Sequence, residues 1–124
     1  MWLIFMARRS IGAEAIEEAV YILLMLIPLG RVTTYSSLAR TLGISPRTVG
    51  RILSRNRNIV VIPCHRVVMR DGRIGGYTPG GVGIKKRLLE LEGVRFRGDR
   101  VDPGCVIDIA EMLGVGRRSR APNI

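Results

Sequence analysis

Residues 37–55 have the sequence SLARTLGISPRTVGRILSR, which predicts two short helices joined by a tight turn. The first helix is expected over 37–42 and should end at Gly43, because glycine readily takes the left-handed conformation found after helices. Ser45 followed by Pro46 is typical of a helix start, with serine as the N-cap and proline as the first helical residue. This outline is that of a helix-turn-helix, a motif common in DNA-binding proteins.

The second helix of this motif, expected over 47–55, is predicted to have two different faces. Its arginines are spaced four residues apart and therefore share one face, while apolar residues fall on the other. The arginines are Arg47, Arg51 and Arg55, and the apolar residues are Val49, Ile52 and Leu53. A solvated basic face and a DNA-binding face both fit this pattern. The helix-turn-helix outline and the charge of the whole chain favour DNA.

The composition narrows the class of protein. The chain has 124 residues, enough for one domain, with 47% hydrophobic residues and a formal net charge of +10. Such a charge points to a polyanionic partner, nucleic acid before membrane, although a skewed genome composition would produce the same arginine bias. Two cysteines and one histidine exclude a disulfide scaffold and an ordinary zinc site. The most hydrophobic run, 19–29, is too short to span a membrane, so we expect a soluble cytoplasmic protein.

The rest of the chain predicts further short elements around this motif. Short apolar runs that end at proline or at a turn signal predict buried strands, and a glycine-rich loop lets the backbone come close to a ligand. The expected elements are a helix from the N-cap Ser10 to a stop at 28–30, strands at 59–62 and 67–69, a hairpin turn at Asp71-Gly72 returning into 73–74, a glycine loop at 75–81, a helix over 84–91 and a short helix over 106–113.

The segment IPCHRVV, residues 62–68, places a thiol beside the chain's one histidine and an arginine, at the end of an expected buried strand. A reactive cysteine needs its thiolate, which nearby cations or an imidazole favour, whereas a structural cysteine is buried and inert. Adjacent side chains rarely point the same way, so His65 would reach Cys64 more easily through a water molecule. A carboxylate would then have to orient His65, and Glu92 and Glu90 are both candidates.

Several motifs around this segment occur together in one known family. They are PCHRVV at 63–68, GGY at 75–77, GG at 80–81, Lys85 and LLELEG at 88–93, with GRVTTYSSLA at 30–39 and PRTVG at 46–50 upstream. In this order, over about residues 20–93, the chain resembles the C-terminal domain of O6-alkylguanine-DNA alkyltransferases. Members of that family usually carry an N-terminal domain before this one. Only about 19 residues precede the matching region here, so we expect that domain to be absent.

The resemblance implies a reaction centre made of four residues. Cys64 matches the alkyl acceptor, which attacks the alkyl carbon on guanine O6. His65 matches the residue that deprotonates the thiol through water, and Glu92 matches the carboxylate that orients this histidine. Tyr35 matches the tyrosine that gives a proton to guanine N3, so that the base leaves neutral. The resemblance implies no cofactor and no metal.

The resemblance also implies how DNA and the lesion are bound. Arg47 matches the arginine finger that fills the gap left by the flipped nucleotide, and its helix would lie in the minor groove. The implied DNA-binding residues are Arg47, Thr48, Gly50, Arg51 and Arg55; the guanine pocket is lined by Val67, Tyr77 and Thr78; and Asn56 belongs to the turn after the helix. At Thr78-Pro79 the chain departs from the family, which has a serine-containing step there.

The expected fold is mostly α with a short β-hairpin, a winged-helix-like helix-turn-helix in a single domain over 1–124. Its core is expected at about 13–94, followed by an extension over 95–124. The expected function is single-turnover DNA repair, in which an alkyl group passes from O6-alkylguanine in double-stranded DNA to Cys64. A homodimer or an associated repair protein would take the place of the missing domain.

Two other functions are compatible with parts of this pattern. An alkyltransferase-like protein would bind the alkylated guanine and flag it for other repair proteins without removing the group. That class lacks the acceptor cysteine, whereas Cys64 is present here. A basic helix-turn-helix protein with an inert cysteine is the third alternative, and it leaves the PCHR and glycine motifs unexplained.

Overall fold

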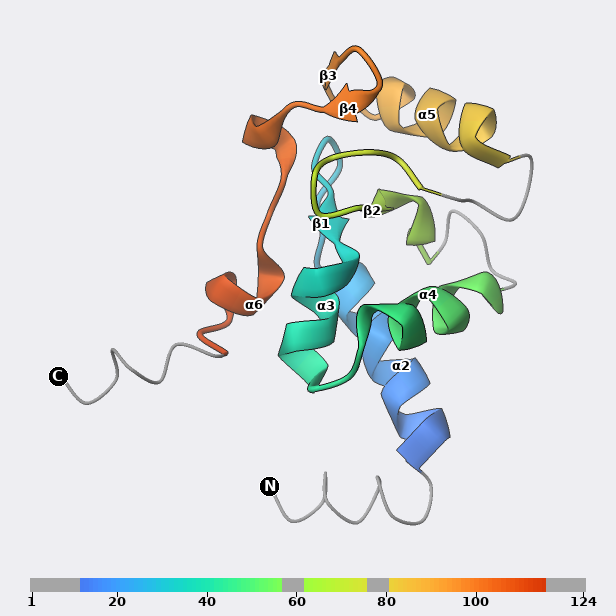
Figure 1. Ribbon diagram of the computed structural model, residues 1–124, viewed down its shortest axis with the longest axis vertical. Helices are drawn as coiled ribbons and strands as arrows, with labels where there is room; N and C mark the ends of the chain where they lie inside the picture. The colour runs from blue at the N-terminus through green and yellow to red at the C-terminus, as the bar shows by residue number, and fades with distance from the viewer. Residues whose placement is uncertain (1–11, 57–61, 76–80, 116–124) are drawn as a thin grey trace, which may run out of the picture.

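Helices make up most of the part of the chain that the computed structural model describes, residues 12–56, 62–75 and 81–115. The α-helices are α2 (Gly12–Leu24), α3 (Tyr35–Leu42), α4 (Pro46–Ser54), α5 (Gly81–Leu91) and α6 (Ile109–Met112), with 3-10 helices η2 (Cys64–Arg66) and η3 (Pro103–Cys105). The strands are β1 (Thr33–Thr34), β2 (Val67–Val68), β3 (Phe96–Arg97) and β4 (Arg100–Val101). The predicted fold class, mostly α with a helix-turn-helix, is confirmed (Figure 1). None of the helices within these described ranges has the length and apolar character needed to cross a membrane.

The helix-turn-helix is formed by α3 and α4, as its turn residues predict. Gly43 closes α3 with a φ of 70°, in the left-handed region, and the Ser45 side chain accepts a hydrogen bond from the Thr48 backbone N–H at the start of α4. The first helix begins at Tyr35, two residues earlier than expected, because the Thr34 hydroxyl accepts the Ser37 backbone N–H and acts as the N-cap.

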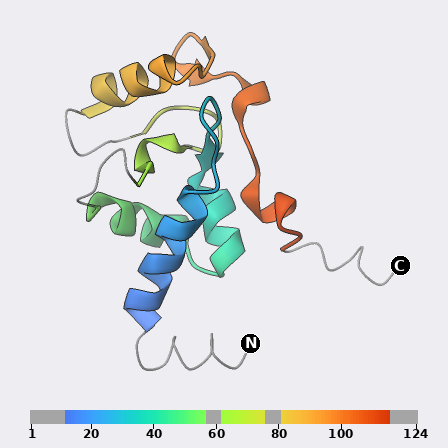
Figure 2. The same cartoon turned by 180° about the vertical axis from the view of Figure 1, so that it is seen from behind.

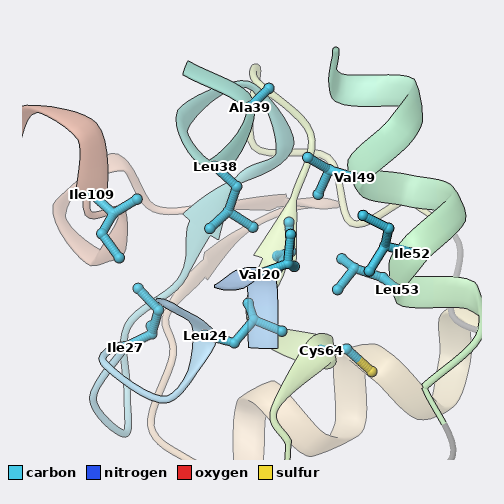
Figure 3. Close-up of a cluster of buried hydrophobic side chains, with 11 residues drawn as sticks. Val20, Leu24, Ile27, Leu38, Ala39, Val49, Ile52, Leu53, Cys64 and Ile109 are labelled. Carbon is cyan, nitrogen blue, oxygen red and sulfur yellow. The ribbon is translucent and has the colours of Figure 1, made fainter. Parts of the chain in front are cut away.

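One apolar cluster holds the motif against α2. Figure 2, the view from behind, shows α2 in front of the two helices of the motif, and Figure 3 shows their apolar side chains meeting. The inward positions predicted for α4 are confirmed, because all three are buried. Each fully buried aliphatic side chain contributes about 1.5–3 kcal/mol to folding. The cluster consists of Val20, Leu24, Ile27, Leu38, Ala39, Val49, Ile52, Leu53, Cys64, Val67 and Ile109.

The strands differ from the hairpin that the sequence predicts. The turn at Asp71-Gly72 is present, since the Met69 backbone N–H donates to the Arg73 carbonyl at 2.8 Å. However, β2 pairs in parallel with β1, and Arg73 instead forms an isolated bridge with Arg100. The antiparallel hairpin is β3–β4, which the sequence analysis missed. A parallel pair of two-residue strands from distant parts of the chain leaves no local pattern to detect.

Other predicted elements change in length or lie outside the described residues. The first helix ends at Leu24, before the expected stop at 28–30, because a tighter turn follows it. The helix expected over 84–91 begins at Gly81. Ser10, most of the strand expected over 59–62 and most of the glycine loop lie outside the described residues.

The segment after α5 returns to the helix-turn-helix. It passes through β3 and β4, runs beside β1 and ends in α6 next to α3 (Figure 1). The Val32 backbone N–H donates to the Cys105 carbonyl at 2.9 Å, and the Ile107 N–H donates to the Val32 carbonyl at 2.7 Å. The helix expected over 106–113 is shorter because its first residues pair with Val32, and Asp108 then caps α6.

Candidate active site

Cys64 begins η2, directly after Pro63, at one edge of the apolar cluster (Figure 3). Its side chain is buried, with an exposed fraction of 7%. The short 3-10 helix then turns the chain into β2, whose pairing with β1 places Cys64 near the start of α3. The segment η2, which carries the nucleophile predicted from the sequence, contacts α5 and α2.

Glu92, at the end of α5, contacts two residues of η2. Its Oε2 lies 2.8 Å from His65 Nε2, and the Arg66 guanidinium donates to both carboxylate oxygens at 2.9 and 3.0 Å. Arg66 also donates to the Ile27 carbonyl at 2.8 Å. Burial alone would raise the pKa of Glu92, but the hydrogen bonds from Arg66 and His65 outweigh it and lower that pKa. Glu92 is therefore ionised and accepts a hydrogen bond from His65, whereas Glu90 is exposed.

Tyr35, the first residue of α3, lines a pocket of about 580 Å³. Burial of the phenol, together with the negative charge of Cys64, raises the pKa of Tyr35, so its hydroxyl keeps the proton. The pocket opens between the start of α4 and the loop that follows β2. It is lined by Tyr35, Ser36, Pro46, Arg47, Gly50, Met69, Arg70 and Gly75.

Two glycines bring the backbone close to Tyr35. A Cβ built on Gly50 would lie 4.0 Å from the Tyr35 ring, and one built on Gly75 would lie 3.7 Å from the Tyr35 hydroxyl and 3.3 Å from Met69 Cγ. Gly75 also has a φ of +73°, a conformation that other residues rarely adopt. A side chain at Gly75 would thus be strained and would narrow the pocket beside Tyr35.

The three arginines of α4 are exposed, as their spacing predicts, but they differ in their contacts. Arg47 lines the pocket at the first turn of α4. Arg55 forms an ion pair with Glu17 of α2, with Arg55 Nε 3.3 Å from Glu17 Oε2. Thr48 lies close to its own helix cap, its hydroxyl 2.9 Å from that of Ser45. The DNA-binding roles of these residues and of Arg51 stay predictions.

The remaining predicted site residues have mixed positions. Asn56 Nδ2 donates to the Ile62 carbonyl at 3.1 Å, which joins the two ends of the segment between α4 and η2. Val67 is buried in β2, in register with Thr33. Tyr77 and Thr78 lie outside the described residues.

Lys85 is the site residue whose position the sequence analysis missed. Its side chain is fully buried, and its Nζ donates to the Ile74 carbonyl at 2.6 Å and lies 5.8 Å from the centre of the Tyr35 ring. Burial lowers the pKa of Lys85 to about 8, against the opposing effect of the Cys64 charge. The spacing of the sequence could have indicated this burial, because Lys85 lies four residues before Leu89, which is buried, and so shares its face of α5.

Comparison with known proteins identifies the family. Residues 15–94 match the family described as 6-O-methylguanine DNA methyltransferase, DNA binding domain. The chain belongs to this family. Its resemblance to alkyltransferases, inferred from the motifs, is thereby confirmed.

Relatives in this family include both transferases and a protein bound to damaged DNA. The methylated-DNA–protein-cysteine methyltransferase of Pyrobaculum aerophilum is 50% identical over 91 residues, which cover 70% of this chain and 60% of that protein. The O6-methylguanine-DNA methyltransferase of the archaeon Pyrococcus kodakaraensis is 49% identical with a TM-score of 0.59, over 63% of this chain and 46% of the other. S. pombe Atl1, in complex with DNA containing O6-carboxymethylguanine, is 31% identical with a TM-score of 0.59, over 68% of this chain and 81% of the other.

The match to these transferases covers part of their length. The chain spans between 46% and 60% of the length of the curated relatives that it matches first. The family membership therefore applies to the DNA-binding domain, and the activity of the whole relatives is a separate question. Within the described residues, no group of three or more His, Cys, Asp or Glu side chains is placed to hold a metal ion.

Proposed function

We propose that this chain repairs alkylated DNA directly, by moving the alkyl group of O6-alkylguanine to Cys64, once per molecule. The observation that supports this most strongly is the contact of Glu92 with the fully buried His65, the residue next to Cys64. Such a contact fixes the imidazole in one tautomer and orients it. The pocket that Tyr35 lines is where a flipped base would bind.

The proposed reaction moves one proton at each end of the transferred alkyl group. Because His65 Nε2 donates to Glu92, its Nδ1 is the nitrogen that takes the thiol proton, through a water molecule. The sulfur of Cys64 then forms a bond to the alkyl carbon as the bond from that carbon to O6 breaks. The electron pair stays on guanine, and the Tyr35 hydroxyl gives its proton to N3, so that guanine leaves as a neutral base. The thioether that results ends the activity of that molecule.

Binding to DNA is proposed to occur through the exposed face of α4. A base inside stacked DNA is out of reach, so the nucleotide must be turned out, which costs a few kcal/mol. Arg47 stands at the rim of the pocket, where its side chain can occupy the gap left in the stack. Gly50 lies one turn further on and lets the helix approach the groove closely, while Arg51 is exposed and suited to phosphate contact.

A second function, lesion binding without transfer, is favoured by one observation. The chain covers 81% of Atl1, which was solved with damaged DNA, but less than half of the Pyrococcus transferase. The presence of Cys64 beside an oriented histidine favours transfer. A cytoplasmic location, a single-domain organisation over 1–124 and a homodimer or associated repair protein stay predictions from the sequence.

The two functions are separated by one experiment. The purified chain is mixed with a duplex that carries a single O6-methylguanine, and the intact mass of the protein is followed with time. We expect a gain of one methylene group, limited to one per molecule, which is absent in Cys64→Ala and retained in Cys105→Ala. Tight binding to the lesion duplex with no gain in mass would instead establish the lesion-binding function.

A further inference from the structure

Lys85 is a buried lysine that the proposed reaction does not yet use. The chain has two lysines, and they are neighbours on α5. Lys85 is fully buried, whereas Lys86 is partly exposed and its amine lies 5.2 Å from the centre of the Phe96 ring. An ammonium group is costly to remove from water, so proteins seldom bury one without specific contacts. The contacts of Lys85 indicate what it does.

The first contact is with the wall of the pocket. The Lys85 amine donates to the Ile74 carbonyl at 2.6 Å. The next residue, Gly75, lines the pocket in a left-handed conformation and lies against both Met69 and Tyr35. The hydrogen bond therefore fixes the backbone at the position where the pocket wall meets the phenol.

The second contact is electrostatic. Among the residues that the structure describes, the titratable side chains that face the amine are Tyr35 from α3 and Cys64 from η2. The negative charge of Cys64 favours the protonated amine, and by the same interaction the ammonium favours a negatively charged sulfur.

We propose that Lys85 is a positioning residue for alkyl transfer, which holds the Gly75 wall of the pocket against Tyr35 and supplies the positive charge that favours the Cys64 thiolate. This inference rests on the proposed transfer reaction. It adds to His65 and Glu92 a further group that acts on the nucleophile. Its consequence is a pH limit, because transfer should slow when the amine loses its proton.

The test compares Lys85→Met with Lys86→Met, which makes the same change one residue away on the surface. We expect Lys85→Met to lower the rate of single-turnover transfer about tenfold or more. The rate of Lys86→Met should stay close to that of the unchanged chain. The pH profile should also change. The rate of the unchanged chain and of Lys86→Met should fall above about pH 8, where Lys85 deprotonates, and that fall should be missing from Lys85→Met. Equal rates and profiles in the two variants would overturn the inference.

Two further measurements keep the inference testable. If the unchanged chain transfers no alkyl group, the proposed function fails. Alkylation of Cys64 by iodoacetamide then decides the role of Lys85. Slower alkylation in Lys85→Met than in Lys86→Met supports that role, and equal rates overturn it.

If Lys85→Met does not fold, NMR titration of 13C-labelled lysine, with Lys86 as internal reference, compares the unchanged chain with Cys64→Ser. A lower Lys85 pKa in Cys64→Ser supports the coupling, and an unchanged pKa overturns it.

Discussion

Cys64 and Cys105 are both buried and both free, yet their surroundings differ. Cys105, in η3, packs among Val32, Val68 and Leu89, and its sulfur accepts a hydrogen bond from the Arg95 backbone N–H at 3.5 Å. Cys64 likewise packs on one side against an apolar cluster. On its other side are an oriented histidine, a phenol that keeps its proton and a buried amine. Because both thiols are buried, we predict that their ionisable neighbours, rather than burial, make Cys64 reactive and leave Cys105 structural.

The largest expected effect separates the two cysteines directly. Cys64→Ala should abolish alkyl transfer from an O6-methylguanine duplex, because the other cysteine, Cys105, packs in a separate apolar cluster. Cys105→Ala should keep the full transfer stoichiometry and lower the free energy of unfolding by about 1–2 kcal/mol, through the small cavity it leaves. Intact-mass measurement and urea unfolding check the two parts. Alkyl transfer that survives in Cys64→Ala would show that Cys64 is not the nucleophile.

The next effect tests the histidine contact. Glu92→Gln should lower the single-turnover rate about 10²–10⁴-fold, the range for a group that supports general base catalysis, because the imidazole loses its ionised partner. Glu90→Gln changes the same side-chain type at an exposed position of α5 two residues away and should leave the rate unchanged. Rapid-quench transfer assays measure both rates. A similar loss in both variants would point to damage in α5 rather than to His65.

The surroundings of Cys64 should also give stability a characteristic pH dependence. The pKa of Glu92 is lowered on folding, so its contribution is present above its unfolded value near 4.5 and is lost as the pH falls through the folded value. The pKa of Lys85 falls from 10.5 to about 8 on folding, so the unfolded chain binds more protons between these values and stability rises with pH there. Urea unfolding at a series of pH values should show that the free energy of unfolding changes with pH in both ranges. The change in the alkaline range should be missing from Lys85→Met.

The smallest expected effect lies on the surface, away from both thiols. The ion pair between Arg55 and Glu17 is partly exposed, so Glu17→Gln should lower the free energy of unfolding by less than about 1 kcal/mol. The same change frees Arg55 for phosphate contact and should strengthen binding to undamaged duplex at low salt. Fluorescence anisotropy against salt concentration checks the binding. Unchanged affinity would mean that Arg55 lies outside the DNA surface.

The sequence predicted those parts of the site that depend on local signals. The cap residues Gly43 and Ser45 located the helix-turn-helix, because capping involves only neighbouring residues. Sequence reasoning alone narrowed the partner of His65 to two glutamates, and the family resemblance then selected Glu92, which the structure places in contact with His65. That the contact orients His65 for catalysis stays a prediction.

The parts that could not be predicted depend on distant residues or on burial. The β1–β2 pair joins residues 33 and 67 through strands of only two residues, too short to leave an alternating pattern. Lysine is almost always at the surface, so the burial of Lys85 contradicts the usual assignment of a charged residue to the solvent side of a helix. Both features become visible only when α3, η2 and α5 are placed together.

The short parallel pair of β1 and β2 fixes the relative positions of two residues of the proposed reaction. Tyr35 follows β1 directly and Cys64 lies just before β2, so the pairing of Thr33 with Val67 sets the distance between the proposed proton donor and the proposed nucleophile. A slip of one residue would displace one of them by about 3.3 Å and turn its strand over. In the proposed reaction, this two-residue register therefore keeps Tyr35 and Cys64 aligned with each other.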